Sequence, residues 1–167
     1  MERAKYLYNY IRENTDIFKE EEFIKANSNL TAEGTLYLIM QEINTSIYDK
    51  TYAILGDGYL AKALSELFDK LGLEYNMYAR NLGNLNKIDV DKNIYINTIP
   101  AMIFDKEIIE KLTKVDYVID LASAPGGVNF EALDEKNIKY NHALALPGKY
   151  CPKTAGELIG KLLTKEN

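Results

Sequence analysis

The chain has 167 residues, of which 47% are hydrophobic and 27% charged, and its net charge at pH 7 is −5. This size predicts one globular domain that buries its core without disulfides or a metal. The acidic balance argues against nucleic acid as a partner, because there is no basic excess to neutralise a phosphate backbone. No apolar run reaches the ~20 residues that cross a bilayer and no secretory signal is visible, so we expect a cytoplasmic protein without a membrane partner. A lone histidine and a lone cysteine argue against a metal site.

The first part of the chain is predicted to be helical over three segments, residues 3–11, 20–26 and 31–43. We expect a helical appendage over residues 1–44, followed by an α/β domain over residues 45–167. Tyrosines gather in the appendage, and Tyr6 and Tyr10 are one helical turn apart. Tyrosine buries area while keeping a polar tip, which suits interfaces. The first helix is therefore expected to pack on another subunit, as in a homo-oligomer such as a dimer, or to cap the sheet.

From Thr51 onward, short β-rich runs alternate with helical patterns. The predicted strands cover residues 51–55, 74–78, 94–96, 117–121 and 138–144. The predicted helices cover residues 60–71, a segment capped by Asp105, residues 130–136, and a last helix that opens at a capping box of Thr154 and Glu157. The polar segment 81–92 is expected to form a loop or a single helical turn. This alternation predicts a doubly wound, Rossmann-type parallel sheet of about five strands with helices on both faces.

The first strand leads into a glycine loop, Gly56-Asp57-Gly58-Tyr59-Leu60-Ala61. The motif G-x-G-x-x-[GA] between a strand and a helix is typical of dinucleotide binding, because the free amides of the helix N-terminus face the phosphates. The cofactor-binding candidates here are Gly56, Asp57, Gly58, Tyr59 and Leu60. The alternative is a turn that only needs glycine. Asp57 also opposes binding, unless its carboxylate points outward.

The end of the second strand bears on the choice of cofactor. An acidic residue there would bond the ribose of NAD, whereas this chain has Arg80 and Asn81. A guanidinium pairs with a 2′-phosphate through two hydrogen bonds, so the sequence favours NADP over NAD. The alternative is that Arg80 is a solvated surface residue.

Later loops end strands at the same carboxyl edge of the predicted sheet. Further cofactor-binding candidates in these loops are Asn97, Thr98, Ile99, Pro100, Ala122 and Ser123. Lys149 and Lys153 can hold the carboxylates of a small diacid, although such lysines are usually solvated. His142 is interpreted as structural rather than as a general base. No catalytic residue is assigned.

Several stretches resemble the A subunit of dipicolinate synthase, the enzyme that makes the spore metabolite pyridine-2,6-dicarboxylate. They are residues 31–34 (Thr-Ala-Glu-Gly), 97–101 (Asn-Thr-Ile-Pro-Ala), 119–123 (Ile-Asp-Leu-Ala-Ser), 125–128 (Pro-Gly-Gly-Val), 146–149 (Leu-Pro-Gly-Lys) and 152–157 (Pro-Lys-Thr-Ala-Gly-Glu). The resemblance covers about residues 28–163. It implies a Rossmann domain that oxidises dihydrodipicolinate with a nicotinamide cofactor as hydride acceptor. It also implies a small dicarboxylate substrate and a flavoprotein-like second synthase subunit as partner.

The sequence departs from this family at three points. The family's subunit is about twice as long and has a further α/β domain before Thr31. Its glycine loop usually has an apolar residue and an arginine where Asp57 and Tyr59 stand here, and its lysine before Pro-Gly-Gly is Ala124. Each substitution removes positive charge or adds negative charge. Two interpretations stay open: a cofactor domain of an active oxidoreductase, or a shortened relative acting as a non-catalytic nucleotide-binding or scaffold module within a complex.

Overall fold

The computed structural model describes residues 19–165, with side chains for residues 19–161. Five parallel strands form one sheet in the order β2-β1-β3-β4-β5. They are β1 (Thr51–Leu55), β2 (Glu74–Tyr78), β3 (Ile94–Asn97), β4 (Tyr117–Asp120) and β5 (Tyr140–His142). The strand order reverses between β1 and β3, which is where open parallel sheets bind ligands at their carboxyl ends. The predicted fold class is confirmed.

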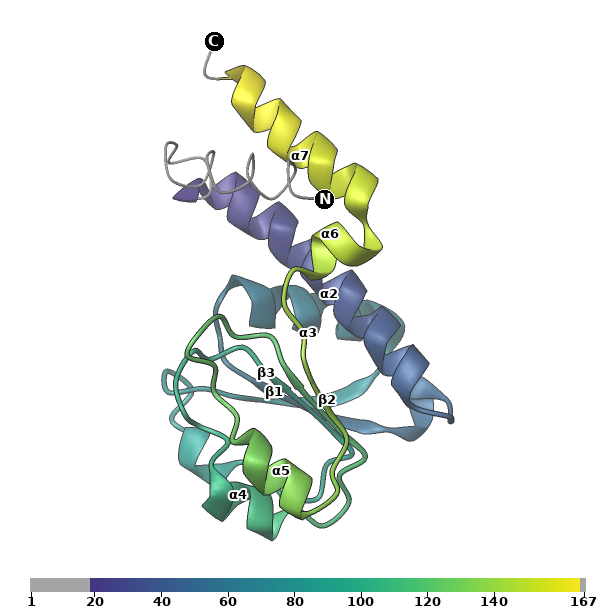
Figure 1. Ribbon diagram of the computed structural model, residues 1–167, viewed down its shortest axis with the longest axis vertical. Helices are drawn as coiled ribbons and strands as arrows, with labels where there is room; N and C mark the ends of the chain where they lie inside the picture. The colour runs from purple at the N-terminus through teal and green to yellow at the C-terminus, as the bar shows by residue number, and fades with distance from the viewer. Residues whose placement is uncertain (1–18, 166–167) are drawn as a thin grey trace.

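Helices cover both faces of this sheet (Figure 1). One face carries α2 (Glu21–Glu42) and α3 (Tyr59–Leu71), the other carries α4 (Lys106–Lys111) and α5 (Phe130–Glu135), and α6 (Leu146–Tyr150) and α7 (Pro152–Lys165) pack against α2. Strand residues alternate between two cores, as their pleat requires. Tyr52 and Ile54 pack beneath α2 and α3, whereas Ala53 and Leu55 pack on the opposite face. No helix in the described part of the chain is long and apolar enough to cross a bilayer.

Several predicted elements agree closely with the structure. Strands β1 and β2 have the predicted bounds, and α3 ends at Gly72, whose φ of 67° is the left-handed C-cap conformation. Asp105 caps α4 by accepting a hydrogen bond from the amide of Ile108 at 3.0 Å. The segment between β2 and β3 is a loop with one short 3-10 turn, η3 (Leu85–Lys87). Strong local signals therefore placed these elements correctly.

The prediction of two helices over residues 20–26 and 31–43 was wrong, because α2 is one continuous helix. The polar residues between them have low helix propensity, which suggested a break. Ser28 and Leu30 are buried, so tertiary packing overrides that local preference. The hydroxyl of Thr31 also bonds back to the carbonyl of Asn27 at 2.7 Å. The predicted helix over residues 3–11, with Tyr6 and Tyr10, lies outside the described residues, and the domain boundary at residue 44 stays a prediction.

The C-terminal elements also differ from the prediction. Residues 146–150 form the short helix α6, although they were predicted as a loop. The last helix begins at Pro152, so Thr154 lies in its first turn and is not the N-cap of a capping box. Proline suits the first helical position, because its fixed φ fits a helix and its missing N–H would have no partner there. Strand β5 is shorter than predicted, and the chain leaves it through Ala145 in a left-handed conformation.

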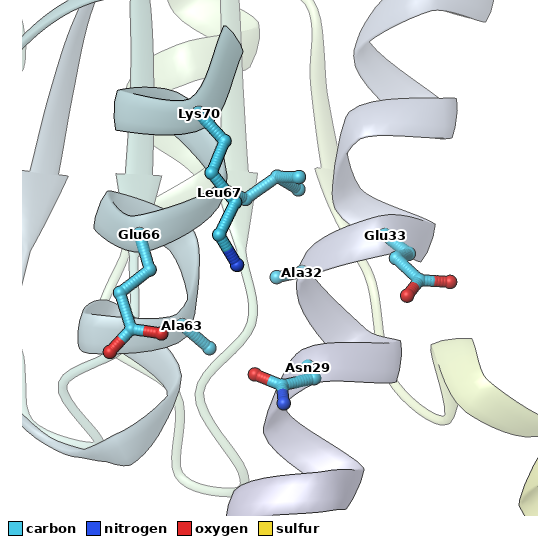
Figure 2. Close-up of a pocket in the computed structure, with 7 residues that line it drawn as sticks. All are labelled: Asn29, Ala32, Glu33, Ala63, Glu66, Leu67 and Lys70. Carbon is cyan, nitrogen blue, oxygen red and sulfur yellow. The ribbon is translucent and has the colours of Figure 1, made fainter.

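α2 and α3 pack side by side through small residues. Figure 2 shows Ala32 of α2 and Ala63 of α3 at the seam, with Lys70 reaching over it from α3. A small pocket of about 170 Å³ lies between the two helices there. This packing holds the middle of α2 against α3.

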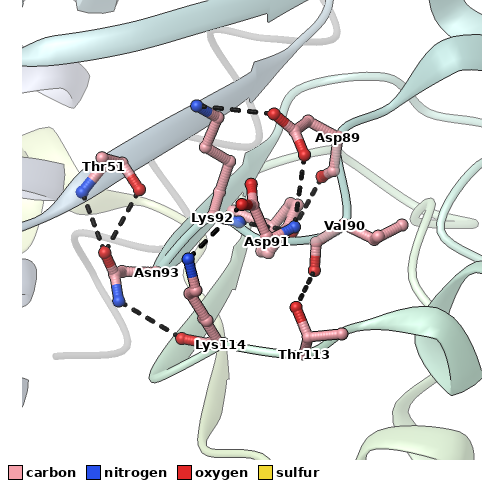
Figure 3. Close-up of polar contacts among 9 residues, drawn as sticks. Thr51, Asp89, Val90, Asp91, Lys92, Asn93, Thr113 and Lys114 are labelled. Atoms are coloured by element: carbon pink, nitrogen blue, oxygen red, sulfur yellow. Dashed lines mark hydrogen bonds and ion pairs between the residues drawn. The ribbon is translucent and has the colours of Figure 1, made fainter.

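Polar contacts close the amino edge of the sheet (Figure 3). The side-chain carbonyl of Asn93 accepts hydrogen bonds from the amide and the hydroxyl of Thr51, at 3.1 and 3.2 Å. The Asn93 amide donates to the carbonyl of Lys114 at 3.3 Å. Asn93 therefore joins the starts of β1, β3 and β4. Tyr95 of β3 donates to the carbonyl of Asp89 at 2.8 Å, and burial raises the pKa of its hydroxyl.

Lys136 joins the two helices on the second face. Its ammonium donates to the carbonyls of Ile109, Glu110 and Leu112 at 3.0–3.1 Å, where α4 ends. A cation at a helix C-terminus satisfies free carbonyls and complements the helix dipole. Replacing Lys136 by methionine should lower the free energy of unfolding by about 1 kcal/mol. Urea denaturation measures this change.

The matched control is Lys111→Met. Lys111 is an exposed lysine of α4 whose ion pair with Glu107, at 2.7 Å, spans one helical turn. Exposed pairs of this kind contribute about 0.3–0.5 kcal/mol, so this variant should be nearly as stable as the parent. Equal losses in the two variants would contradict the special role of Lys136.

Candidate functional site

The glycine loop lies between β1 and α3, at the strand-order reversal. Gly56 has a φ of 125°, a conformation that side chains rarely adopt, and a Cβ there would overlap the hydroxyl of Thr98. Its amide donates to the carbonyl of Tyr78 at the end of β2, at 2.8 Å. Glycine at this position therefore lets the loop approach the neighbouring chain segments closely.

Gly58 is the N-cap of α3 and has an ordinary φ of −74°. Within the described residues, no atom lies within 4 Å of where its Cβ would be, so this position opens into free space. The first intrahelical bond runs from the amide of Lys62 to the carbonyl of Gly58. The amides of the first turn have no intrahelical acceptor, and the helix dipole favours negative charge beside them.

The loop after β3 contacts the glycine loop. Thr98 donates through both its amide and its hydroxyl to the carbonyl of Leu55, at 2.9 and 2.8 Å. Asn97 is 1% exposed, and its side chain bonds the backbone of Ile99 in both directions. Asn97 was predicted as a cofactor-binding residue, but in this structure its side chain is engaged in holding the loop.

Asp120, at the end of β4, completes this arrangement. It is fully buried and pairs in register with Asn97, whose side-chain amide donates to it at 2.8 Å. Its two carboxylate oxygens also accept from the amides of Ala122 and Gly127, each at 3.1 Å. Sequence reasoning missed Asp120. The available signal was an acidic residue at the end of a fully buried strand, where such a residue needs several donors.

The glycine loop, the loop after β3 and helix α2 surround a cleft of about 450 Å³. The predicted residues that line it are Gly56, Asp57, Gly58, Tyr59, Leu60, Thr98, Ile99 and Pro100. Ile24 and Ser28 of α2 form the opposite wall, and sequence reasoning missed both. Tyr59 is 42% exposed, and it helps to lower the pKa of Glu21 at the start of α2, after the larger effect of Lys25. Residues of α2 and α3 therefore line the same ligand-sized cleft.

Two predicted residues lie beyond the rim of this cleft. Asn81 donates to the carboxylate of Asp57 at 2.6 Å, which ties that carboxylate to the loop after β2. Arg80 is exposed at the start of the same loop.

The other predicted residues lie apart from the cleft. Ala122 is buried and Ser123 is exposed after β4, while Lys149 and Lys153 are exposed on α6 and α7. His142 has Nε2 at 3.1 Å from the carbonyl of Ala122, and its ring packs on Phe130.

A second depression, of about 640 Å³, lies beside the first. Its lining is mainly apolar and comes from α2, the chain after β4 and β5, α6 and α7, including Phe23, Leu121, Leu144, Leu146 and Pro147. Leu60 lines both spaces. A ligand that binds at the first turn of α3 can therefore extend along the carboxyl edge of the sheet into an apolar site.

Comparison with known proteins identifies relatives. No family model matches the chain. It is 31% identical to the A subunit of dipicolinate synthase from Bacillus subtilis (strain 168), over 92% of this chain and 57% of that protein. The crystal structure of the B. subtilis protein superposes with a TM-score of 0.83 at 30% identity, covering 96% of this chain and 60% of that one. The corresponding Bacillus halodurans structure gives 0.82 at 26% identity, covering 96% and 62%. The chain thus spans less than two thirds of these relatives.

More distant solved structures share the fold. An NADPH-dependent glyoxylate/hydroxypyruvate reductase from Sinorhizobium meliloti superposes with a TM-score of 0.58 at 14% identity, over 75% of this chain and 64% of that one. At this identity the likeness establishes the fold alone.

Two glycine substitutions separate folding from binding in the glycine loop. Gly56→Ala introduces a side chain at a positive φ and against Thr98. It should lower stability by about 2 kcal/mol or more and also abolish ligand binding. Gly58→Ala should leave the thermal midpoint unchanged, while its methyl group projects into the cleft and weakens dinucleotide binding. Thermal denaturation and ligand titration of both variants check this. Unimpaired binding by folded Gly58→Ala would show that the ligand does not approach this loop.

Proposed function

Because this chain is a relative of the A subunit of dipicolinate synthase, we propose that it binds a nicotinamide dinucleotide and serves in the oxidation of dihydrodipicolinate to dipicolinate. The single observation that carries the proposal is the cleft at the N-terminus of α3, where free amides, an unobstructed Gly58 and a neighbouring apolar depression follow one another along the sheet edge. This order suits the pyrophosphate and then the nicotinamide of a dinucleotide.

The chain's own residues would bind and orient the cofactor. The first-turn amides of α3 would donate to the pyrophosphate, and Gly58 leaves the space that this contact needs. The buried Asn97–Asp120 pair would hold the loops after β3 and β4 in place beneath the ligand. Apolar residues of the second depression would exclude water from the reacting ring. A bound nicotinamide supplies the hydride acceptor for the oxidation.

The choice of NADP over NAD is proposed from Arg80. Its guanidinium is exposed directly after β2, beside Asn81, which is already bonded to Asp57. A guanidinium in this place suits a 2′-phosphate. The remaining assignments are also proposals. They are a dicarboxylate substrate, with Lys149 and Lys153 as candidates for its carboxylates, a second synthase subunit as partner, a homo-oligomer such as a dimer, and a cytoplasmic role in sporulation.

A charge substitution tests the cofactor preference. Purified protein should bind NADPH more tightly than NADH, and Arg80→Ala should weaken NADPH binding about tenfold while leaving NADH binding nearly unchanged. Lys87→Ala is the matched control, because Lys87 is an exposed cation of the same loop. Fluorescence titration of the reduced cofactors provides the affinities. Tighter binding of NADH by the parent protein would overturn the preference.

A second candidate function is a non-catalytic nucleotide-binding or scaffold module within a complex. It is favoured by Asp57, a cleft-lining residue whose negative charge opposes tight occupancy by an anion.

An assay of cofactor reduction distinguishes the oxidoreductase from the scaffold module. The protein is mixed with dihydrodipicolinate and NADP, alone and with a candidate second subunit, and the absorbance of the reduced cofactor is followed. Reduction in either mixture supports the oxidoreductase. Cofactor binding without reduction in both mixtures would favour the scaffold.

A further inference from the structure

Ser28 of α2 has an unusual environment for a serine within a helix. It is only 7% exposed, and it lines the cleft in front of the glycine loop. Its hydroxyl has no hydrogen-bond partner among the described residues. The oxygen keeps some accessible surface, since within the described part of the chain no fully buried polar side-chain atom is left unpartnered, and Ser28 lines the cleft.

Its neighbours on the same helix behave differently. Thr31 and Thr35 bond their hydroxyls back to the carbonyls of Asn27 and Thr31, at 2.7 and 2.8 Å. This is the usual way in which a hydroxyl inside a helix finds a partner. The Ser28 hydroxyl does not make this bond, so its donor and acceptor capacity is available to a ligand in the cleft. A ligand in the cleft would supply the hydrogen-bond partner that the Ser28 hydroxyl lacks among the described residues.

The opposite wall of the cleft indicates the chemistry of that partner. There the first turn of α3 presents backbone amides, and Gly58 has no side chain to cover them. The amides and the hydroxyl are all able to donate toward the same space, and the helix dipole favours negative charge. The carboxylate of Asp57 is the opposing group, and Asn81 ties it to the loop after β2. α2 packs along α3, with Ala32 and Ala63 facing each other across a small pocket, and this packing sets the separation of the two walls (Figure 2).

We propose that Ser28 is a phosphate-binding residue, whose hydroxyl donates to an oxygen of a bound pyrophosphate from the side opposite the glycine loop. The inference rests on the proposed dinucleotide function. It adds a donor from a helix that precedes β1 and lies outside the glycine motif. α2 is then part of the ligand site, and a bound diphosphate joins α2 to α3.

Ser28→Ala tests this role, with NADPH, ADP and adenosine as probes. The variant should bind NADPH and ADP about tenfold more weakly, as loss of a hydrogen bond to a charged group implies. Its affinity for adenosine, which has no phosphate, should equal that of the parent. The thermal midpoint without ligand should not fall, because no hydrogen bond within the protein is lost. Ser28→Cys keeps the size without a strong donor and should reproduce the affinity loss.

Ser65→Ala is the matched control. Ser65 is a serine of α3 whose hydroxyl bonds the carbonyl of Lys62 at 2.9 Å, so the variant should bind all three probes like the parent. Unchanged NADPH and ADP binding by Ser28→Ala would overturn the inference and leave the proposed function standing. Equal losses for ADP and adenosine would assign Ser28 to packing and would also overturn it. A parent protein that binds neither NADPH nor ADP would contradict the proposed function itself.

Discussion

The contact between the backbone of Gly56 and the side chain of Thr98 is the constraint on which the rest of the site depends. It brings the chain leaving β1 against the chain leaving β3, where Gly56 bonds the carbonyl of Tyr78 and Thr98 bonds that of Leu55. With the loop held there, α3 begins at Tyr59 after its N-cap Gly58, and its first-turn amides lie beside the cleft. The buried carboxylate of Asp120 fixes the next two loops in the same way. Hydrogen bonds within the protein thus hold the loops of the carboxyl edge in place, and such preorganisation favours binding.

Local patterns were enough to predict the parts of the fold that depend on near neighbours in sequence. The bounds of β1 and β2, the end of α3 at Gly72 and the Asp105 cap all follow from alternation, glycine and capping chemistry. The continuity of α2 could not be predicted, because Ser28 and Leu30 are held in a helix by packing against distant elements. The short helix α6 was missed for a similar reason.

In the candidate site, too, features that depend on near neighbours in sequence could be predicted, and those that depend on distant contacts could not. The glycine loop and Thr98–Pro100 could be located from their motifs, and the structure brings them to one cleft. The roles of Asp120 and Ser28 depend on residues far away in sequence, as the Asn97–Asp120 bond across 23 positions illustrates. A single sequence carries no periodicity for such contacts. Asp57 was identified as an unfavourable charge, and its bond to Asn81 explains how the loop accommodates it.

The central claim is that the first turn of α3 binds the phosphates of a dinucleotide. The most direct measurement is amide chemical-shift perturbation in the isotope-labelled protein during titration with NADPH. The account predicts that the largest shifts fall on the amides of Gly58, Tyr59, Leu60 and Ala61, with smaller shifts at the amino edge around Asn93. Saturable binding that leaves these four amides unmoved would contradict it.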